Sequence, residues 1–294
     1  MAATWTVVDG LGGAEQEQVA ALLDAIERRT GDEALTESQR ERLEAGEHVR
    51  HALRRDAAGV LTGYAVIAIE ETVAAEPAYG TFDFGLAHLL ENEQTQVTLL
   101  LRTVEREVES HLGERGWRPL RTLHRLRRGL PAPPPPASHV TVRPFVPGLD
   151  DEAWVELNNE AFAHHPSQGD MTVARLRARF KESWFDPAGF RMYFDGERLV
   201  ASCWTKVHRT SEGDVGEIYV VAVAPSAQGQ GLGRYAVLEG LAHLSAGGAT
   251  EAELYVEETN RPAYALYEAL GFEYASRIVQ FARDPTPPIR PDRS

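Results

Sequence analysis

One segment constrains the fold of this chain more than any other: a β-rich run that leads through a glycine-rich turn directly into a helical pattern. Residues 217–224 have the apolar, β-branched composition of a strand, and Gly229, Gly231 and Gly233 follow in the turn. Glycines let backbone N–H groups approach an anion, and the N-terminus of the next helix adds a positive dipole. The segment therefore predicts a strand, loop and helix that bind a diphosphate without a lysine.

Other phosphate-binding motifs lack their defining residues here. The glycine spacing is not G-x-G-x-x-G, and no lysine follows as in a P-loop. A generic glycine-rich connection between a sheet and a helix remains the structural alternative. The run 228–233, Gln-Gly-Gln-Gly-Leu-Gly, instead resembles the Q/R-x-x-G-x-G/A loop of the GNAT acetyltransferases, which holds the pyrophosphate of coenzyme A.

A second motif follows in the order that this family requires. Residues 254–260, Leu-Tyr-Val-Glu-Glu-Thr-Asn, and 263–272, Ala-Tyr-Ala-Leu-Tyr-Glu-Ala-Leu-Gly-Phe, resemble the strand, Asn and N-x-x-A-x-x-x-Y-x-x-L-G-F helix that close a GNAT domain. The chain is therefore identified as a member of the GNAT family. Membership implies acetyl-CoA as cosubstrate and a mixed α/β fold in which helices flank a central sheet.

The resemblance also implies which residues contact coenzyme A, and it implies no metal. The backbone of the strand is expected to pair with the pantetheine arm and to polarise the thioester carbonyl, although an ordinary central strand fits the same residues. The implied coenzyme contacts are, along the strand, Val221, Ala222 and Val223, in the loop, Gln228, Gly229, Gln230, Gly231, Leu232, Gly233 and Arg234, and in the second motif, Asn260, Arg261, Pro262, Ala263, Tyr264 and Ala265.

Two residues are candidates for proton transfer. An ammonium has no lone pair, so a base must remove its proton, and Glu217 begins the strand that leads to the loop. An edge carboxylate in solvent is the alternative. The GNAT resemblance implies that the Tyr267 hydroxyl protonates the departing thiolate, whereas its helical position, shared with Leu266 and Leu270, also fits simple core packing.

Residues 140–282 are similar, more closely, to the mycothiol synthase family, a tandem of two GNAT-like domains whose second copy is catalytic. The matching segments are 158–163, 165–169, 184–189, 204–208 and 216–221. The similarity implies transfer of acetyl to the cysteinyl amine of a cysteine-glucosamine-inositol conjugate, the last step of mycothiol biosynthesis. The implied acceptor contacts are Glu217, Lys206, Tyr255 and, from the first domain, Glu47.

Residue chemistry alone would explain these acceptor contacts differently. Lys206 fits a strand-end cation, Tyr255 a sheet residue and Glu47 one surface acid among many. The chain also departs from the family, because Ser167 stands where the family has an acceptor-facing Glu. Two alternatives therefore stay open: a GNAT enzyme for another small-molecule or peptide amine, and a catalytically silent acetyl-CoA-binding module.

Proline-rich stretches divide the chain. The run 131–136, Pro-Ala-Pro-Pro-Pro-Pro, excludes a helix or central strand. We therefore expect a degenerate GNAT-like domain over 1–130, a linker over 131–138, the catalytic domain over 139–283 and a flexible tail over 284–294. The first domain is expected to contain helices over 15–26 and 97–108, a strand over 60–69 and no second phosphate loop, so a second coenzyme A site is not predicted.

Charge and cysteine content narrow the setting. The net charge of −14 disfavours nucleic acid and anionic membrane surfaces as partners. The single cysteine, Cys203, cannot form an internal disulfide and sits in an apolar run that predicts a buried strand residue. No apolar run reaches the length of a membrane span. We expect a cytoplasmic monomer.

Overall fold

The computed structural model describes residues 3–30, 33–45, 48–69, 72–91, 93–163, 169–210 and 213–285. The chain divides into two compact units, one made of residues 1–124, 257–259 and 276–294, the other of residues 125–256 and 260–275. Strands β6 (Arg118–Gly129) and β12 (Glu273–Arg283) each begin in one unit and end in the other. The domain limits expected from the proline-rich run, 1–130, 131–138, 139–283 and 284–294, stay a prediction.

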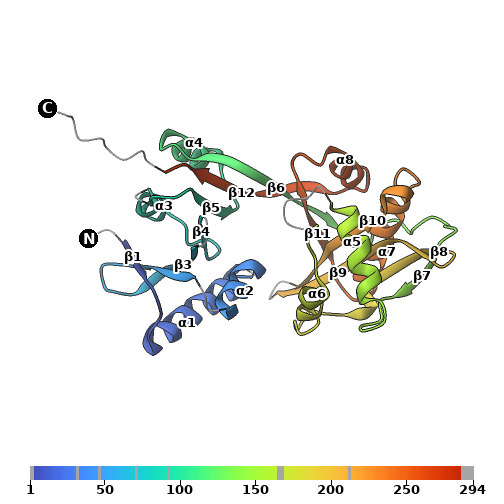
Figure 1. Cartoon of the computed structure of the whole chain (residues 1–294), viewed down its shortest axis with the longest axis horizontal. Coiled ribbons are helices and arrows are strands. Elements are labelled where there is room, and N and C mark those ends of the chain that lie inside the picture. Colours follow the sequence, from blue (N-terminus) through green and yellow to red (C-terminus); the bar gives the residue numbers. More distant parts are fainter. Residues whose placement is uncertain are drawn as a thin grey trace. The chain divides into compact units, whose positions relative to one another are not determined.

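The first unit combines a mainly antiparallel sheet with four described helices (Figure 1). Its sheet has the order β1-β2-β3-β4-β5-β12, in which only β4 and β5 are parallel neighbours. The strands are β1 (Thr4–Val8), β2 (Val49–Arg55), β3 (Leu61–Ile69), β4 (Val73–Pro77) and β5 (Val97–Arg102), and the helices are α1 (Gly13–Thr30), α2 (Glu37–Ala45), α3 (Phe84–Leu90) and α4 (Arg106–Glu114). The expected first helix and the strand at 60–69 are confirmed.

The helix expected over 97–108 is wrong. Residues Val97–Arg102 form strand β5, which pairs with both β4 and β12, and helix α4 begins only at Arg106. The apolar residues of 97–108 do recur at helical spacing, but Thr98 and Leu99 between them are buried as well. A short run that is buried on both faces is a central strand, and periodicity alone does not separate it from a helix.

The N-terminus of α3 in the first unit already carries an internal anion. Helix α3 follows β4 as α7 (Leu232–Ala246) follows β10 (Gly213–Val223) in the second unit. The Asp83 carboxylate accepts hydrogen bonds from the Gly85 amide at 2.8 Å and the Trp5 indole at 2.7 Å, and it pairs with Arg54 at 2.7 Å. A diphosphate at this helix end would meet a carboxylate of like charge. This is a physical reason for the expectation that the first unit binds no coenzyme A.

The second unit contains the sheet on which the candidate site is built (Figure 1). Its strand order is β6-β11-β10-β9-β8-β7, with β10 and β11 parallel and β7 to β10 antiparallel. The strands are β7 (Thr141–Pro144), β8 (Phe190–Asp195), β9 (Arg198–Thr210), β10 (Gly213–Val223) and β11 (Glu251–Glu257), and the helices are α5 (Asp151–Ala161), α6 (Val173–Arg179), α7 (Leu232–Ala246) and α8 (Arg261–Ala269). No helix in the described ranges has both the length and the apolar character of a membrane span.

Helix α7 packs closely against strands β9 and β10. Its Ala236, Val237 and Leu241 are fully buried in one core with Ala222 of β10. Gly240 faces Cys203, which is buried as expected, and burial raises the pKa of this thiol to about 12. The thiol therefore stays protonated at neutral pH and is a packing residue rather than a nucleophile.

Gly240→Ala is expected to destabilise the second unit by about 1–3 kcal/mol, because it overpacks this contact. A Cβ at position 240 would lie 2.7 Å from the Cys203 Sγ and 2.9 Å from the Ile218 Cδ1. Gly129→Ala is the matched control, since nothing lies within 4 Å of its Cβ. Urea denaturation of both variants checks the prediction, and equal midpoints would contradict it.

Candidate functional site

The connection between β10 and α7 is shaped to bind an anion. A single turn of 3₁₀-helix, Pro225–Ala227, follows β10, and Gly229 and Gly231 then adopt φ angles of +76° and +80°, which favour glycine. Gly231 is the N-cap of α7 and supplies no side-chain oxygen. The first amide N–H groups of α7 therefore lack intrahelical acceptors and are directed, with the positive end of the helix dipole, at whatever binds there.

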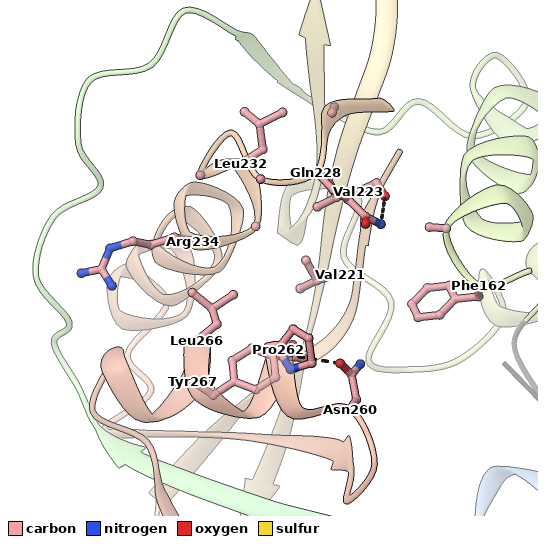
Figure 2. Close-up of a pocket in the computed structure, with 16 residues that line it drawn as sticks. Phe162, Val221, Val223, Gln228, Leu232, Arg234, Asn260, Pro262, Leu266 and Tyr267 are labelled. Carbon is pink, nitrogen blue, oxygen red and sulfur yellow. Dashed lines mark hydrogen bonds between the residues drawn. The ribbon is translucent and has the colours of Figure 1, made fainter. Parts of the chain in front are cut away.

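A cavity of about 500 Å³ opens beside this loop, within the second unit (Figure 2). It is enclosed by the β10 end, the loop, the start of α7, helix α8 and the end of α5. The lining residues are Ala161, Phe162, Val221, Val223, Ala227, Gln228, Gly229, Gly231, Leu232, Gly233, Arg234, Asn260, Pro262, Ala263, Leu266 and Tyr267. Figure 2 shows Phe162, at the end of α5, on the other side of the cavity from Leu266 and Tyr267 of α8, with Val221 of β10 between them.

Strand β10 is open along the edge that leads to this cavity. Among the described residues it pairs with β11 only over Val215–Glu217, and its register with β9 shifts between Ile218 and Val220. Beyond that point the side chains of Val221 and Val223 line the cavity, whereas Ala222 is buried in the core. An extended ligand can add to such an edge through its own amide groups, as an extra strand does.

Helix α8 closes the cavity with its first two turns. Asn260 caps the helix, since its Oδ1 accepts a hydrogen bond from the Ala263 amide at 3.2 Å. Asn260, Pro262 and Ala263 line the cavity, as the sequence suggested, whereas Arg261, Tyr264 and Ala265 are not among its lining residues. The Arg234 side chain extends away from Val221 (Figure 2), and Gln230 instead donates to the Ser226 carbonyl at 3.3 Å.

Tyr267 lines the cavity while its ring packs edge-on against Phe272, with ring centroids 5.9 Å apart. Burial raises the pKa of Tyr267 to about 12. The phenol therefore keeps its proton at neutral pH and can donate it. Phe162 and Leu266, which line the same cavity, were not predicted as site residues. The position of Phe162, at the end of α5, depends on tertiary packing, and the helical spacing of Leu266 suggested only core packing.

A second group of polar side chains forms a row across three adjacent strands. Lys206 of β9 lies opposite Glu217 of β10, and Glu217 lies opposite Glu253 of β11. Directly opposed residues share one face of a sheet. All three are buried, with exposures of 7%, 7% and 2%. The interpretation of Glu217 as a solvated edge carboxylate is therefore wrong.

Each end of this row is held by further contacts. Arg125 and Arg127 of β6 donate to the Glu253 Oε2 at 2.7–2.9 Å, and the Tyr255 hydroxyl lies 3.5 Å from its Oε1. The Lys206 Nζ lies 4.9 Å from the Trp184 ring centre. These contacts place Lys206, Glu217 and Tyr255 in one cluster. Glu47 and Ser167 both lie outside the described residues.

His208, which the sequence analysis did not single out, completes the cluster. Its Nε2 donates to the Glu217 Oε2 at 2.7 Å. Burial opposes the charged imidazole, but the hydrogen bond and negative charge of Glu217 outweigh it and raise the pKa of His208. His208, Glu217 and Glu253 hold ligand-type atoms within 4.8 Å of one another, yet the two guanidinium groups on Glu253 compete with a metal cation there.

The sequence of this chain is similar to those of known acetyltransferases. The model of the "Acetyltransferase (GNAT) family" matches residues 152–272. The chain is 41% identical over 281 residues to the mycothiol acetyltransferase of Streptomyces scabiei, with 89% of each chain covered. It is 37% identical over 296 residues to that of Thermomonospora curvata, with 94% of this chain and 96% of the relative covered.

Solved structures share the fold over almost the whole chain. A GCN5-related N-acetyltransferase from Sphaerobacter thermophilus aligns with a TM-score of 0.67 at 23% identity, covering 98% of this chain and 96% of its own. A tandem GNAT protein from the clavulanic acid biosynthesis pathway aligns with a TM-score of 0.65 at 16% identity, covering 96% and 99%. At these identities the two structures support the tandem fold alone.

Proposed function

The chain belongs to the GNAT family of acetyl-CoA-dependent N-acetyltransferases, and from this premise we propose that it acetylates the cysteinyl amine of a cysteine-glucosamine-inositol conjugate in mycothiol biosynthesis. Relatives that carry the name mycothiol acetyltransferase match nearly the full chain, which supports this reaction. One observation carries the proposal most directly: strand β10 joins a buried carboxylate, Glu217, to an anion-binding loop and an open cavity.

The proposed mechanism assigns one task to each part of the site. The amides of the loop 228–234 and the start of α8 bind coenzyme A, and the open edge of β10 holds its pantetheine arm. Glu217 takes a proton from the ammonium group of the acceptor, whose freed lone pair attacks the thioester carbonyl. The C–S bond then breaks, Tyr267 gives its proton to the thiolate of coenzyme A, and the second proton that the acceptor nitrogen must lose restores the tyrosine through solvent.

The acceptor would bind at the polar row, whose Glu217 precedes the cavity-lining Val221 by four residues on β10. Lys206 and Tyr255 offer a cation and a phenol to the sugar and inositol hydroxyls, next to the proposed base. The proposal locates the reaction in the cytoplasm, where acetyl-CoA is available. A monomeric state and the lack of nucleic acid or membrane partners stay predictions.

Purified protein with acetyl-CoA and a panel of amines tests the proposal. Because the cysteinyl acceptor has its own thiol, product and free coenzyme A should be measured by chromatography and mass rather than by a thiol reagent. We expect turnover with the cysteinyl conjugate and its S-methyl form, but none with its N-acetyl form. Faster turnover of another amine, for which Ser167 gives a reason, would redirect the proposal. Coenzyme binding without turnover on any amine would favour a silent module.

The loop assignment predicts a separation between two glycine variants. Gly231→Val is expected to weaken coenzyme A binding at least about tenfold, because a β-branched residue is strained by about 1–2 kcal/mol at φ +80° and its side chain crowds the anion-binding amides. Gly248→Val is the matched control, since Gly248 also has a positive φ, +98°, and nothing within 4 Å of its Cβ, but it lies beyond the C-terminus of α7. Calorimetric titration of both proteins checks this, and equal affinities would contradict the assignment.

A further inference from the structure

Resting on the proposed role of Glu217 as the base, we propose that His208 is a positioning residue for it. The imidazole holds the carboxylate through Oε2, which fixes the side chain and leaves Oε1 to receive the proton of the acceptor amine. In the described part of the chain, the Glu217 carboxylate has no other hydrogen-bond partner. A base with one tethered oxygen keeps a single orientation, which is what rapid proton transfer requires.

The fold places His208 and Glu217 together through strand pairing. Glu217 is opposed by Lys206, and His208 follows two residues later on β9, so its side chain lies on the same face. His208 is thus a diagonal neighbour of Glu217, within reach of an imidazole. The N···O separation of 2.7 Å is that of a charge-assisted hydrogen bond.

Several charged groups surround the pair of His208 and Glu217. Burial and the charge of Lys206 lower the pKa of His208, but Glu217 and, less strongly, Glu253 raise it above its ordinary value. A protonated imidazole in turn interacts favourably with the Glu217 carboxylate. Glu253 would repel that carboxylate, but Arg125 and Arg127 compensate its charge. Cationic side chains therefore lie next to both buried carboxylates.

Two His208 variants separate positioning from packing. His208→Leu removes the donor, whereas the amide nitrogen of His208→Gln can take the place of Nε2. We expect His208→Leu to lower kcat about 10–100-fold with an unchanged KM for acetyl-CoA, and His208→Gln to restore most of the rate, within about threefold of wild type. The matched control is His243→Gln, since His243 is a partly exposed histidine of α7 that pairs with Asp186 rather than with Glu217.

The pH profile gives a readout that packing alone would not change. His208→Leu removes the hydrogen bond that the imidazole makes to the charged form of the buried Glu217 carboxylate. The acid limb of kcat/KM should therefore move to higher pH in His208→Leu, and less so in His208→Gln. A His208→Leu enzyme with wild-type turnover and an unmoved acid limb would overturn the proposal.

A measurement without acceptor keeps this inference distinct from the proposed reaction. Histidine ring signals can be followed by NMR during a pH titration, and His208→Gln identifies the signal of His208. Glu217→Gln should lower the pKa of His208, because it removes the negative charge that raises it. An unmoved pKa would overturn the pairing. If wild type acetylates none of the amines, the proposed function fails, while this titration still decides whether His208 and Glu217 act as a pair.

Discussion

Glu217→Gln is expected to lower kcat for acetyl transfer by about two to four orders of magnitude at neutral pH. The amide has the shape of the carboxylate but cannot accept a proton from an ammonium, so only the small neutral fraction of the acceptor can react. The rate of the variant should therefore rise with pH until the amine itself loses its proton. Initial rates measured by product chromatography from pH 6 to 10 check both the loss and the recovery.

The control for Glu217→Gln is Glu197→Gln, which makes the same change of charge at an exposed residue of the same unit. We expect wild-type turnover from this control and unchanged coenzyme A binding from both variants. Unfolding midpoints should also stay close, since Gln fits the buried space that Glu217 occupies. Normal turnover of Glu217→Gln at neutral pH would remove Glu217 as the base, whatever the acceptor.

Each part of the site that we predicted from the sequence is one continuous segment of the chain. The glycine loop and the start of α8 each lie within a few residues, so local backbone chemistry is enough to predict them. The structure places most of these residues at one cavity. The sequence does not predict in which direction each side chain extends. Arg234, for example, extends away from Val221.

The parts that the sequence did not predict depend on pairing between strands. Glu253 meets Glu217 only because β10 and β11 are parallel in one particular register, and that register is set by the packing of the whole unit. One signal was available. Arg125 and Arg127 flank the buried Leu126, which indicates a strand with a charged face, and that face needs a carboxylate partner.

Strand β5 illustrates the same limit on the fold. Its residues carry apolar spacing that suits a helix, and only the two neighbouring strands, one of them from the far end of the chain, make it a strand. A pattern of six residues does not contain that information. Helix α1 was predicted correctly because it is long, exposed on one face and stabilised by local spacing.

Tyr267→Phe is expected to lower kcat by about two orders of magnitude while coenzyme A binding stays unchanged. Phe keeps the ring that packs against Phe272 and lines the cavity, and it removes only the hydroxyl. The thiolate of coenzyme A must then leave without a proton donor. An acetyl thioester whose thiol has a lower pKa should therefore lose less rate in the variant than acetyl-CoA does, which steady-state kinetics with both thioesters can measure.

The raised pKa of Tyr267 adds a test by pH. Because burial raises this pKa to about 12, the phenol stays protonated up to high pH, and its ionisation should cause no loss of rate between pH 8 and 10. Tyr274→Phe, at an exposed position of β12, is the control and should leave both kcat and its pH dependence unchanged. If Tyr267→Phe turns over as fast as wild type, the tyrosine is a packing residue, and water must protonate the leaving thiolate.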